Sequence, residues 1–294
     1  RAEKNDPRSS SHAGLFFSKG CYYRYTNNIT DAVKNFNLAR RDGEWGTRAL
    51  ECMIEVYLNP DSGNMWEDMD NGEGNSEAVR VAEKLLRELD VLGVEKTKRH
   101  KVLANYHLLA TRTKSNIDLA MQNFIEMLET DKDYLPALLG MSTAFMMEKS
   151  SNKARNTLKR IAKMTYKIED ANEFERSYLM LADIYVGRGK FDLAQDLCKK
   201  CLGYNKSCSK AWELMGVIME KEQSYKDAAD CYEKSWIFEH EASATIGYKL
   251  AFNYLKAKRY VEAIDICNAV LTLYPDYPKI RKEILEKAMS SLRP

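Results

Sequence analysis

The sequence predicts an all-α fold, a right-handed solenoid in which antiparallel helix pairs stack one on the next. Three observations lead to this fold class. The spacing of apolar residues is mostly three and four, which is typical of amphipathic helices. The 294 residues include only 6 prolines and 14 glycines, and no segment sustains the alternation that marks a half-buried strand. The third observation is an internal repeat.

A pattern of large, small and large residues followed by an alanine recurs after 34 residues. Its two clearest copies are Leu181, Ala182, Tyr185 and Ala194, and then Met215, Gly216, Met219 and Ala228. The period is that of the tetratricopeptide repeat, in which helix A and helix B are joined by a turn. Glycine or alanine stands where the two helices cross, because only small residues let the backbones approach closely. The sequence therefore predicts tetratricopeptide repeats.

The pattern predicts six repeats between residues 13 and 277, allowing one weak or irregular unit among the ranges that it marks. These ranges are 13–46, 47–100, 101–134, 135–168, 175–208, 209–242 and 244–277. An acidic insertion at about 59–75 interrupts the second unit, and its Trp66 either packs locally or contacts a partner. The insertion is not a calcium loop, because alignment on its glycines leaves Ala78 or Arg80 where a bidentate glutamate is needed.

The two ends of the chain differ from the repeats. Residues 278–294 are expected to form a capping helix with Ile280, Ile284, Leu285 and Ala288 on one stripe, which would cover the last apolar face of the solenoid. Residues 1–12 are expected to be the stump of an upstream repeat with a linker, because their spacing is that of a repeat's final turn.

Small and large residues at the repeat positions are expected to pack where helices cross. They are Gly20, Tyr23, Ala32, Ala120, Ala154, Ala182, Ala194, Trp212, Gly216, Ala228, Ala251 and Ala263.

Composition limits the classes of partner. With 45 basic and 43 acidic residues the formal charge is +2, so no global field favours nucleic acid or an anionic membrane. Basic stretches at 153–167 and 96–101 contain no aromatic residue apart from Tyr166 near the end of the first, and we interpret them as solvated helix faces or as sites for an acidic protein surface. No apolar stretch reaches the roughly 20 residues that span a bilayer. The seven cysteines favour reduced thiols and a cytosolic compartment.

Two patterns could carry chemistry. Cys198 and Cys201, with Cys208 following, have spacing that zinc thiolates can use. However, Cys198 and Cys201 fall on repeat positions 24 and 27, where packing residues belong, so buried free thiols are the favoured interpretation. The four histidines form no pair, and no phosphate-binding loop or nucleophile elbow occurs. We therefore predict no catalytic residue, no metal, no cofactor and no enzymatic activity.

Helix A lines the concave groove of a tetratricopeptide solenoid, and its outward positions can be read from the sequence. The lysine and asparagine pattern that clamps a peptide carboxylate in co-chaperones is missing. The groove instead presents mostly large apolar residues, which favours a partner helix or another solenoid. The predicted partner-binding residues are Leu139, Met146, Met147, Glu213, Val217, Tyr248, Phe252 and Leu255.

Three segments resemble the tetratricopeptide repeat protein 21 family. They are GLFFSKGCYYRYTNNITDAVKNFNLARRDGEWG, TRALECMIEVYLNPD and AKRYVEAIDICNAVLTLYPDYPKIRKEILEKA. The resemblance covers the whole chain and corresponds to the C-terminal part of a longer repeat protein.

This resemblance implies a subunit of intraflagellar transport complex A, which acts in retrograde ciliary transport and in cargo entry into cilia. The implied partners are complex A subunits with β-propeller and helical-repeat domains, and ciliary cargo adaptors. The implied locations are the cytoplasm, the cilium and the basal body. A general cytosolic adaptor that binds a helix or an extended peptide is the alternative.

Overall fold

The computed structural model describes residues 12–26, 28–58, 75–91, 97–277 and 279–292. Within these ranges the chain is helical and contains no strand, as the sequence predicts. None of the helices in these ranges is both long enough and apolar enough to cross a bilayer. The expected N-terminal stump and nearly all of the insertion at about 59–75, with Trp66, lie outside the described residues.

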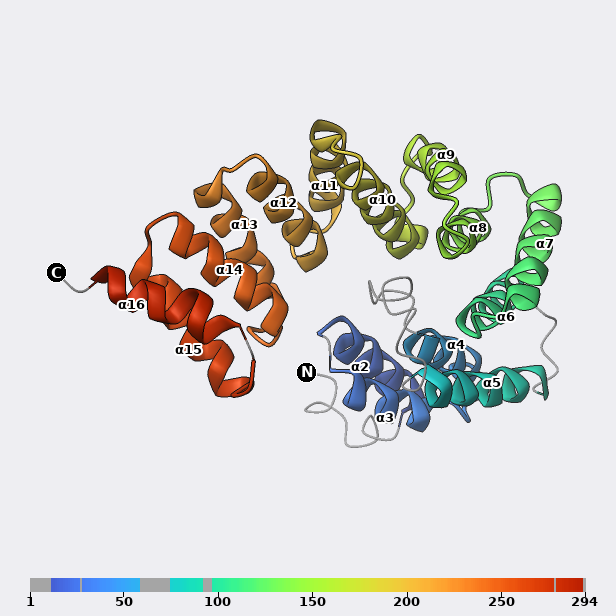
Figure 1. Cartoon of the computed structure of the whole chain (residues 1–294). Helices are drawn as coiled ribbons and strands as arrows, with labels where there is room; N and C mark the ends of the chain where they lie inside the picture. The colour runs from blue at the N-terminus through green and yellow to red at the C-terminus, as the bar shows by residue number, and fades with distance from the viewer. Residues whose placement is uncertain (1–11, 27, 59–74, 92–96, 278, 293–294) are drawn as a thin grey trace. The chain divides into compact units, whose positions relative to one another are not determined.

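The chain divides into two compact units, 1–157 and 158–294, which are described separately. Unit 1 contains helices that run in chain order from the blue to the green part of Figure 1. They are α2 (Ala13–Tyr25), α3 (Ile29–Ala39), α4 (Gly46–Leu58), α5 (Asn75–Val91), α6 (Lys98–Ala110), α7 (Lys114–Thr130), α8 (Leu135–Met147) and α9 (Ser151–Ala162), the last of which crosses the boundary between the units.

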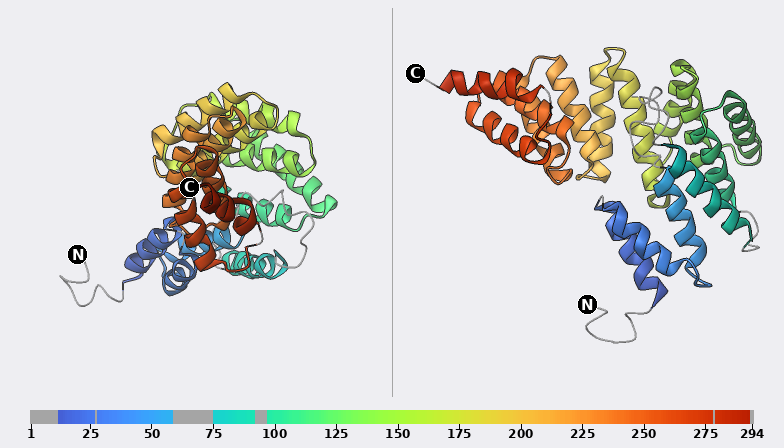
Figure 2. Two further views of the ribbon diagram at one scale, coloured as in Figure 1. Left: turned by 60° about the vertical axis from the view of Figure 1, so that its left-hand side comes forward. Right: turned by 60° about the horizontal axis from the view of Figure 1, so that its bottom comes forward.

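Unit 2 stacks its helices in the same order, and the right-hand view of Figure 2 shows neighbouring helices side by side. They are η3 (Ile168–Asp170), α10 (Ala171–Val186), α11 (Phe191–Tyr204), α12 (Ser209–Lys221), α13 (Tyr225–Phe238), α14 (Ala244–Lys256), α15 (Tyr260–Leu273), η4 (Arg281–Leu285) and α16 (Glu286–Leu292).

The described helices form seven A and B pairs, one more than the six expected units. The even-numbered helices α2 to α14 are the A helices, and the odd-numbered α3 to α15 are the B helices. The pair α4 and α5 brackets the insertion, and the pair α10 and α11 follows the short helix η3. Each of the seven ranges that the repeat marks overlaps one of these pairs.

Close contacts between a glycine and an aromatic ring set the distance between helices. A Cβ added to Gly20 on α2 would lie 2.6 Å from the ring of Phe36 on α3. The same relationship recurs between Gly216 on α12 and the ring of Tyr232 on α13, at 2.8 Å. Since real Cβ atoms do not approach a ring this closely, only glycine fits, and the ring occupies the space that a side chain would fill.

The residues expected at the crossings lie mostly in the interior. Gly20, Ala32, Ala120, Ala154, Ala182, Ala194, Gly216, Ala228, Ala251 and Ala263 are buried, whereas Tyr23 and Trp212 are half-buried. Trp212 lies at a repeat junction, where its Nε1–H donates to the carbonyl of Lys206 at 2.9 Å and the Lys234 ammonium lies 4.1 Å from the ring centroid.

The C-terminal segment covers the end of unit 2. Ile280, Ile284 and Ala288 are fully buried and belong to the same apolar cluster as residues of α14 and α15, such as Leu250 and Val270. These buried positions are four residues apart, so they lie on one stripe that runs from the residue before η4 through η4 and α16. Leu285, which was expected on the stripe, is half-buried beside it.

Candidate functional site

The A helices of unit 2 carry five of the predicted partner-binding residues. Glu213 and Val217 lie on α12, and Tyr248, Phe252 and Leu255 lie on α14. All five are half-buried. We call the surface that they form with Lys249 and Glu220 the A-face of unit 2.

Polar contacts cross this A-face from one repeat to the next. The Oε1 atom of Glu213 lies 2.7 Å from Nζ of Lys249, and Nδ2 of Asn253 donates to Oε2 of Glu220 at 3.0 Å. The hydroxyl of Tyr248 donates to Oε2 of Glu283 at 2.5 Å, and that bond joins α14 to the capping segment. The expected apolar groove is therefore a mixed surface, because charged groups bridge its apolar residues.

These contacts shift the pKa values of Glu213 and Tyr248. Burial alone would raise the pKa of Glu213, but the ion pairs with Lys210 and Lys249 outweigh burial and hold that pKa below its usual value. The hydrogen bond to Glu283, with a contribution from burial, raises the pKa of Tyr248 to about 12. Glu213 is therefore a carboxylate and Tyr248 a neutral phenol at neutral pH.

The apolar members of the A-face pack against the core of unit 2 with part of their surface. Val217, Tyr248, Phe252 and Leu255 all contact the buried cluster of α13, α14 and α15. The Lys256 ammonium lies 5.4 Å from the ring centroid of Phe252, which leaves that ring covered by a cation on one side.

In unit 1 the structure corrects one predicted groove residue. Leu139 on α8 is fully buried, so it does not line an open groove. Leu138 and Gly140 on either side of it are also buried, and three consecutive residues at about 100° each cover most of a helix's circumference. The first turns of α8 are therefore packed all round. Met146 and Met147, at the end of the same helix, are half-buried.

Sequence reasoning missed an ion-pair ladder on the A helices of unit 1. Glu55 on α4 binds Arg24 on α2 through an Oε2 to Nη1 contact of 2.6 Å, and its other oxygen binds Arg99 on α6. One carboxylate thus joins three consecutive A helices. Glu55 occupies an outward position of helix A, and a search for opposite charges at such positions in neighbouring repeats would have found the ladder.

A pocket of about 750 Å³ lies among α5, α6 and α7 of unit 1. Its lining includes the buried His100, whose Nε2 atom lies 3.4 Å from Oδ1 of Asp90, and the half-buried His107. Burial lowers the pKa of His107, so this imidazole is neutral at pH 7.

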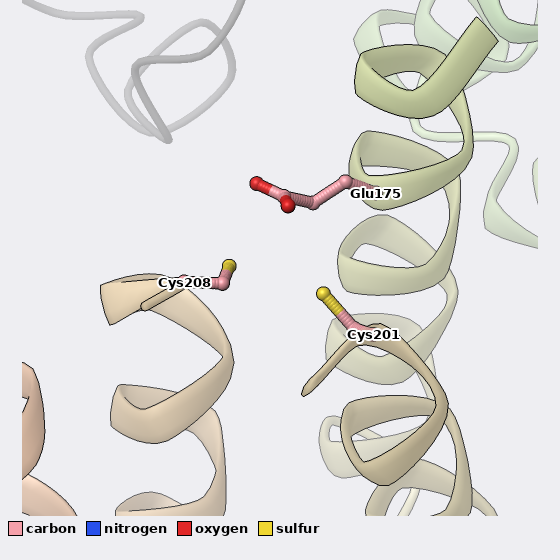
Figure 3. A group of neighbouring side chains, drawn as sticks. All are labelled: Glu175, Cys201 and Cys208. Atoms are coloured by element: carbon pink, nitrogen blue, oxygen red, sulfur yellow. The ribbon is translucent and has the colours of Figure 1, made fainter. Parts of the chain in front are cut away.

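The cysteines predicted to pack in the interior do so, but two of them meet a carboxylate that the sequence did not reveal. Cys198, Cys201 and Cys208 are buried free thiols. The Sγ atoms of Cys201 and Cys208 and a carboxylate oxygen of Glu175 lie within 4.8 Å of one another (Figure 3). Nδ2 of Asn205 donates to Oε2 of Glu175 at 2.8 Å. The hydrogen bond with Cys208, followed by burial, raises the pKa of Cys201 well above its usual value.

Comparison with known protein families agrees with the repeat pattern. The C-terminal ARM domain model of tetratricopeptide repeat protein 21 matches residues 81–289, and the fifth ARM repeats domain model of the same protein matches residues 1–58. The chain belongs to the tetratricopeptide repeat protein 21 family.

Relatives in this family are similar over the whole chain. Tetratricopeptide repeat protein 21B of Homo sapiens is 50% identical over 305 residues, and protein 21A of Mus musculus is 47% identical over 305 residues. Each alignment covers 100% of this chain and 23% of the relative, so the chain spans about a quarter of their length.

A solved structure shares the fold. The crystal structure of the APC/C hetero-tetramer Cut9–Hcn1 superposes with a TM-score of 0.62, at 13% identity, over 96% of this chain and 50% of that chain. At this identity the likeness concerns the fold alone. Stacked helix pairs of this kind are a frequent scaffold for protein contacts, with extended surfaces made by successive repeats.

Proposed function

We propose that the chain is a non-enzymatic scaffold for protein–protein contacts and that it acts as part of a subunit of intraflagellar transport complex A. Membership of the tetratricopeptide repeat protein 21 family carries this proposal. The resemblance implies work in retrograde ciliary transport and in cargo entry, in the cytoplasm, the cilium and the basal body. The proposed partners are complex A subunits with β-propeller and helical-repeat domains, together with ciliary cargo adaptors.

The repeats support a binding role because, in each unit, the B helices pack against one side of the row of A helices and hold that row in place. In unit 2 the small residues Gly216 and Ala251 hold A and B helices close together, which leaves the A-face to present its side chains at fixed spacing. Because its side chains are already held in place, this surface loses little conformational entropy when a folded partner binds.

We place the proposed contact of unit 2 on its A-face. Val217, Phe252 and Leu255 offer apolar area, and the pair of Glu213 and Lys249 offers a charge of each sign beside it. An interface with an apolar centre and a polar rim has this composition. The fitting partner is a folded helical or solenoid surface with apolar residues flanked by charges. Met146 and Met147 remain candidate contacts in unit 1.

Affinity purification of the tagged chain from ciliated cells tests the proposal. We expect subunits of intraflagellar transport complex A to be recovered with the chain and to be lost with the Phe252→Asp variant. Val261→Asp is the matched control, because Val261 lies on the B helix α15 and is 56% exposed. Circular dichroism of both variants checks that they fold.

The outcomes separate the alternatives. Recovery of chaperones or unrelated cytosolic peptides without complex A subunits would favour a general cytosolic adaptor. Recovery of complex A subunits by Phe252→Asp at the level of the parent chain would move the contact away from the A-face while leaving the scaffold role intact.

A further inference from the structure

Three potential metal ligands in unit 2 come from two helices and from the connection before a third. Glu175 is in α10, Cys201 is in the last turn of α11, and Cys208 is the residue before α12. Figure 3 shows their side chains ending around a common space. Such convergence depends on the packing of consecutive helices, because 26 residues separate Glu175 from Cys201.

The distances suit a small thiophilic cation. In a tetrahedral zinc site with bonds of about 2.3 Å to sulfur, the two sulfur atoms are about 3.8 Å apart. The ligand atoms of Glu175, Cys201 and Cys208 all lie within 4.8 Å of one another, so small side-chain rotations would bring them to coordination distance. Thiolate ligands select zinc over magnesium or calcium, which prefer oxygen.

The surroundings of Glu175 have the features of a metal ligand's second shell. Asn205 holds one carboxylate oxygen through its Nδ2 atom, which fixes the orientation of the Glu175 carboxylate. The backbone N–H of Cys208 donates to the carbonyl of Asn205 at 3.3 Å, so the same residue also positions the second thiol. The short α11 to α12 connection therefore fixes both ligands.

A pocket provides room for a fourth ligand. It has a volume of about 190 Å³, and its lining includes Glu175, Cys201, Tyr178 and Asn205. One water molecule needs about 30 Å³ of liquid volume, so water can reach the thiol and the carboxylate from this side.

Core packing explains why cysteine side chains are buried here, but it does not explain why a carboxylate faces two of them. Buried cysteines fill space as small apolar residues do, and Cys198, one turn before Cys201, is an example. A carboxylate that faces two thiols opposes their ionisation, because the three groups would bring together three negative charges. A divalent cation would remove this repulsion and leave a net charge of −1.

We propose that Glu175, Cys201 and Cys208 bind one zinc ion, with a water molecule from the adjoining pocket as the fourth ligand. The ion ties together α10, α11 and α12 and so stiffens the junction between two consecutive repeats. This inference is independent of the ciliary function proposed above, and it departs from the sequence-based expectation of no metal. Binding displaces the two thiol protons, so affinity falls as the pH falls.

Competition with a chromophoric zinc chelator tests the site on the full 294-residue chain after removal of bound metal. We expect one tight equivalent of Zn²⁺, a loss of about 100-fold or more in affinity for Cys201→Ser and for Cys208→Ser, and a loss of about 10-fold to 100-fold for Glu175→Gln. Cys198→Ser is the matched control, since Cys198 is also fully buried on α11 but is outside the ligand group, and it should keep the parent affinity.

Two further measurements keep the test valid if a serine variant fails to fold. With the unaltered chain, saturating Zn²⁺ should slow the alkylation of Cys201 and Cys208 relative to the zinc-free chain, as mapped by peptide mass after labelling long enough for buried thiols to react. The other five of the seven cysteines should be labelled at the same rate with and without Zn²⁺. Substitution by Co²⁺ should give sulfur-to-metal charge-transfer absorption. Absence of a tight equivalent, protection of other cysteines instead, or an equal loss of affinity in Cys198→Ser would overturn the proposal.

Discussion

The ring of Tyr232 packs so closely against the backbone of Gly216 that a Cβ there would lie 2.8 Å from the ring atoms. The ring cannot easily move away, because the Tyr232 hydroxyl donates to Oε2 of Glu220 at 3.1 Å. The distance between helices α12 and α13 is thus set by the absence of one side chain and by a hydrogen bond that fixes the ring.

Gly216→Ala should therefore destabilise the chain although alanine favours helix. Overpacking at a fixed contact costs about 1–3 kcal/mol, which exceeds the gain of about 0.5–1 kcal/mol from replacing a helical glycine. Gly203→Ala on α11 is the control, since a Cβ at Gly203 meets nothing within 4 Å. Urea unfolding followed by circular dichroism should show a loss for the first variant and a small gain for the second. Equal effects would contradict the steric account.

The helices and the crossing residues were predictable from the sequence because their determinants are local. The small residue and the aromatic ring that meets it, such as Gly20 and Phe36, belong to one repeat and recur with its period. Leu139 was misplaced for a related reason, because the repeat pattern places a residue on a helix face but does not say whether a neighbouring element covers that face.

The polar features of the candidate site were less predictable, since they join different repeats. The ion pair between Glu213 and Lys249 connects α12 to α14, and its existence depends on the offset between two helices. The cluster of Glu175, Cys201 and Cys208 depends on the packing of three helices. The sequence identified the thiols by their spacing but gave no signal for the carboxylate, which is one of many glutamates.

The ion pair of Glu213 predicts a pH dependence of stability. The pKa of Glu213 is lowered in the folded chain relative to its usual value of 4.5, so the unfolded chain binds the proton more readily. The stabilisation is therefore present above pH 4.5 and is lost as the pH falls through the lowered pKa. Glu213→Gln should cost about 1–2 kcal/mol at pH 7, the range for a charged hydrogen bond with a partly exposed partner.

The free energy of unfolding of both proteins, measured by urea titration from pH 7 down to about pH 3, checks this dependence, because the unfolded chain begins to bind the Glu213 proton more readily than the folded chain within that window. The difference between the parent chain and Glu213→Gln should shrink below pH 4.5, the usual value for this carboxyl. A difference that stays constant with pH would mean that the carboxylate contributes no stabilising charge.

Leu139 and Met146 on α8 should respond differently to truncation. Leu139 is fully buried, so Leu139→Ala should cost about 2–5 kcal/mol through lost burial and the cavity left behind. Met146 is half-buried, and Met146→Ala should cost about 1 kcal/mol. Thermal unfolding of the two variants measures the contrast. Similar losses would place Leu139 back among the surface residues.

The turns between A and B helices contain a residue with a positive φ, a backbone conformation that glycine adopts more easily than other residues do. Gly189, after α10, has a φ of +69°, and Lys258, at the matching turn after α14, has a φ of +61°. A side chain in this left-handed region costs about 1–2 kcal/mol. Since a Cβ at Gly189 would meet nothing within 4 Å, any cost of adding one there comes from the backbone alone.

Gly189→Ala should therefore destabilise the chain by about 1 kcal/mol, and Lys258→Gly should stabilise it by up to about 1 kcal/mol. The gain is the smaller effect, because glycine also loses more conformational entropy on folding. Melting temperatures of the two variants should move in opposite directions from that of the parent chain. If both fell, the Lys258 side chain would have to stabilise its turn by more than the backbone strain that it brings.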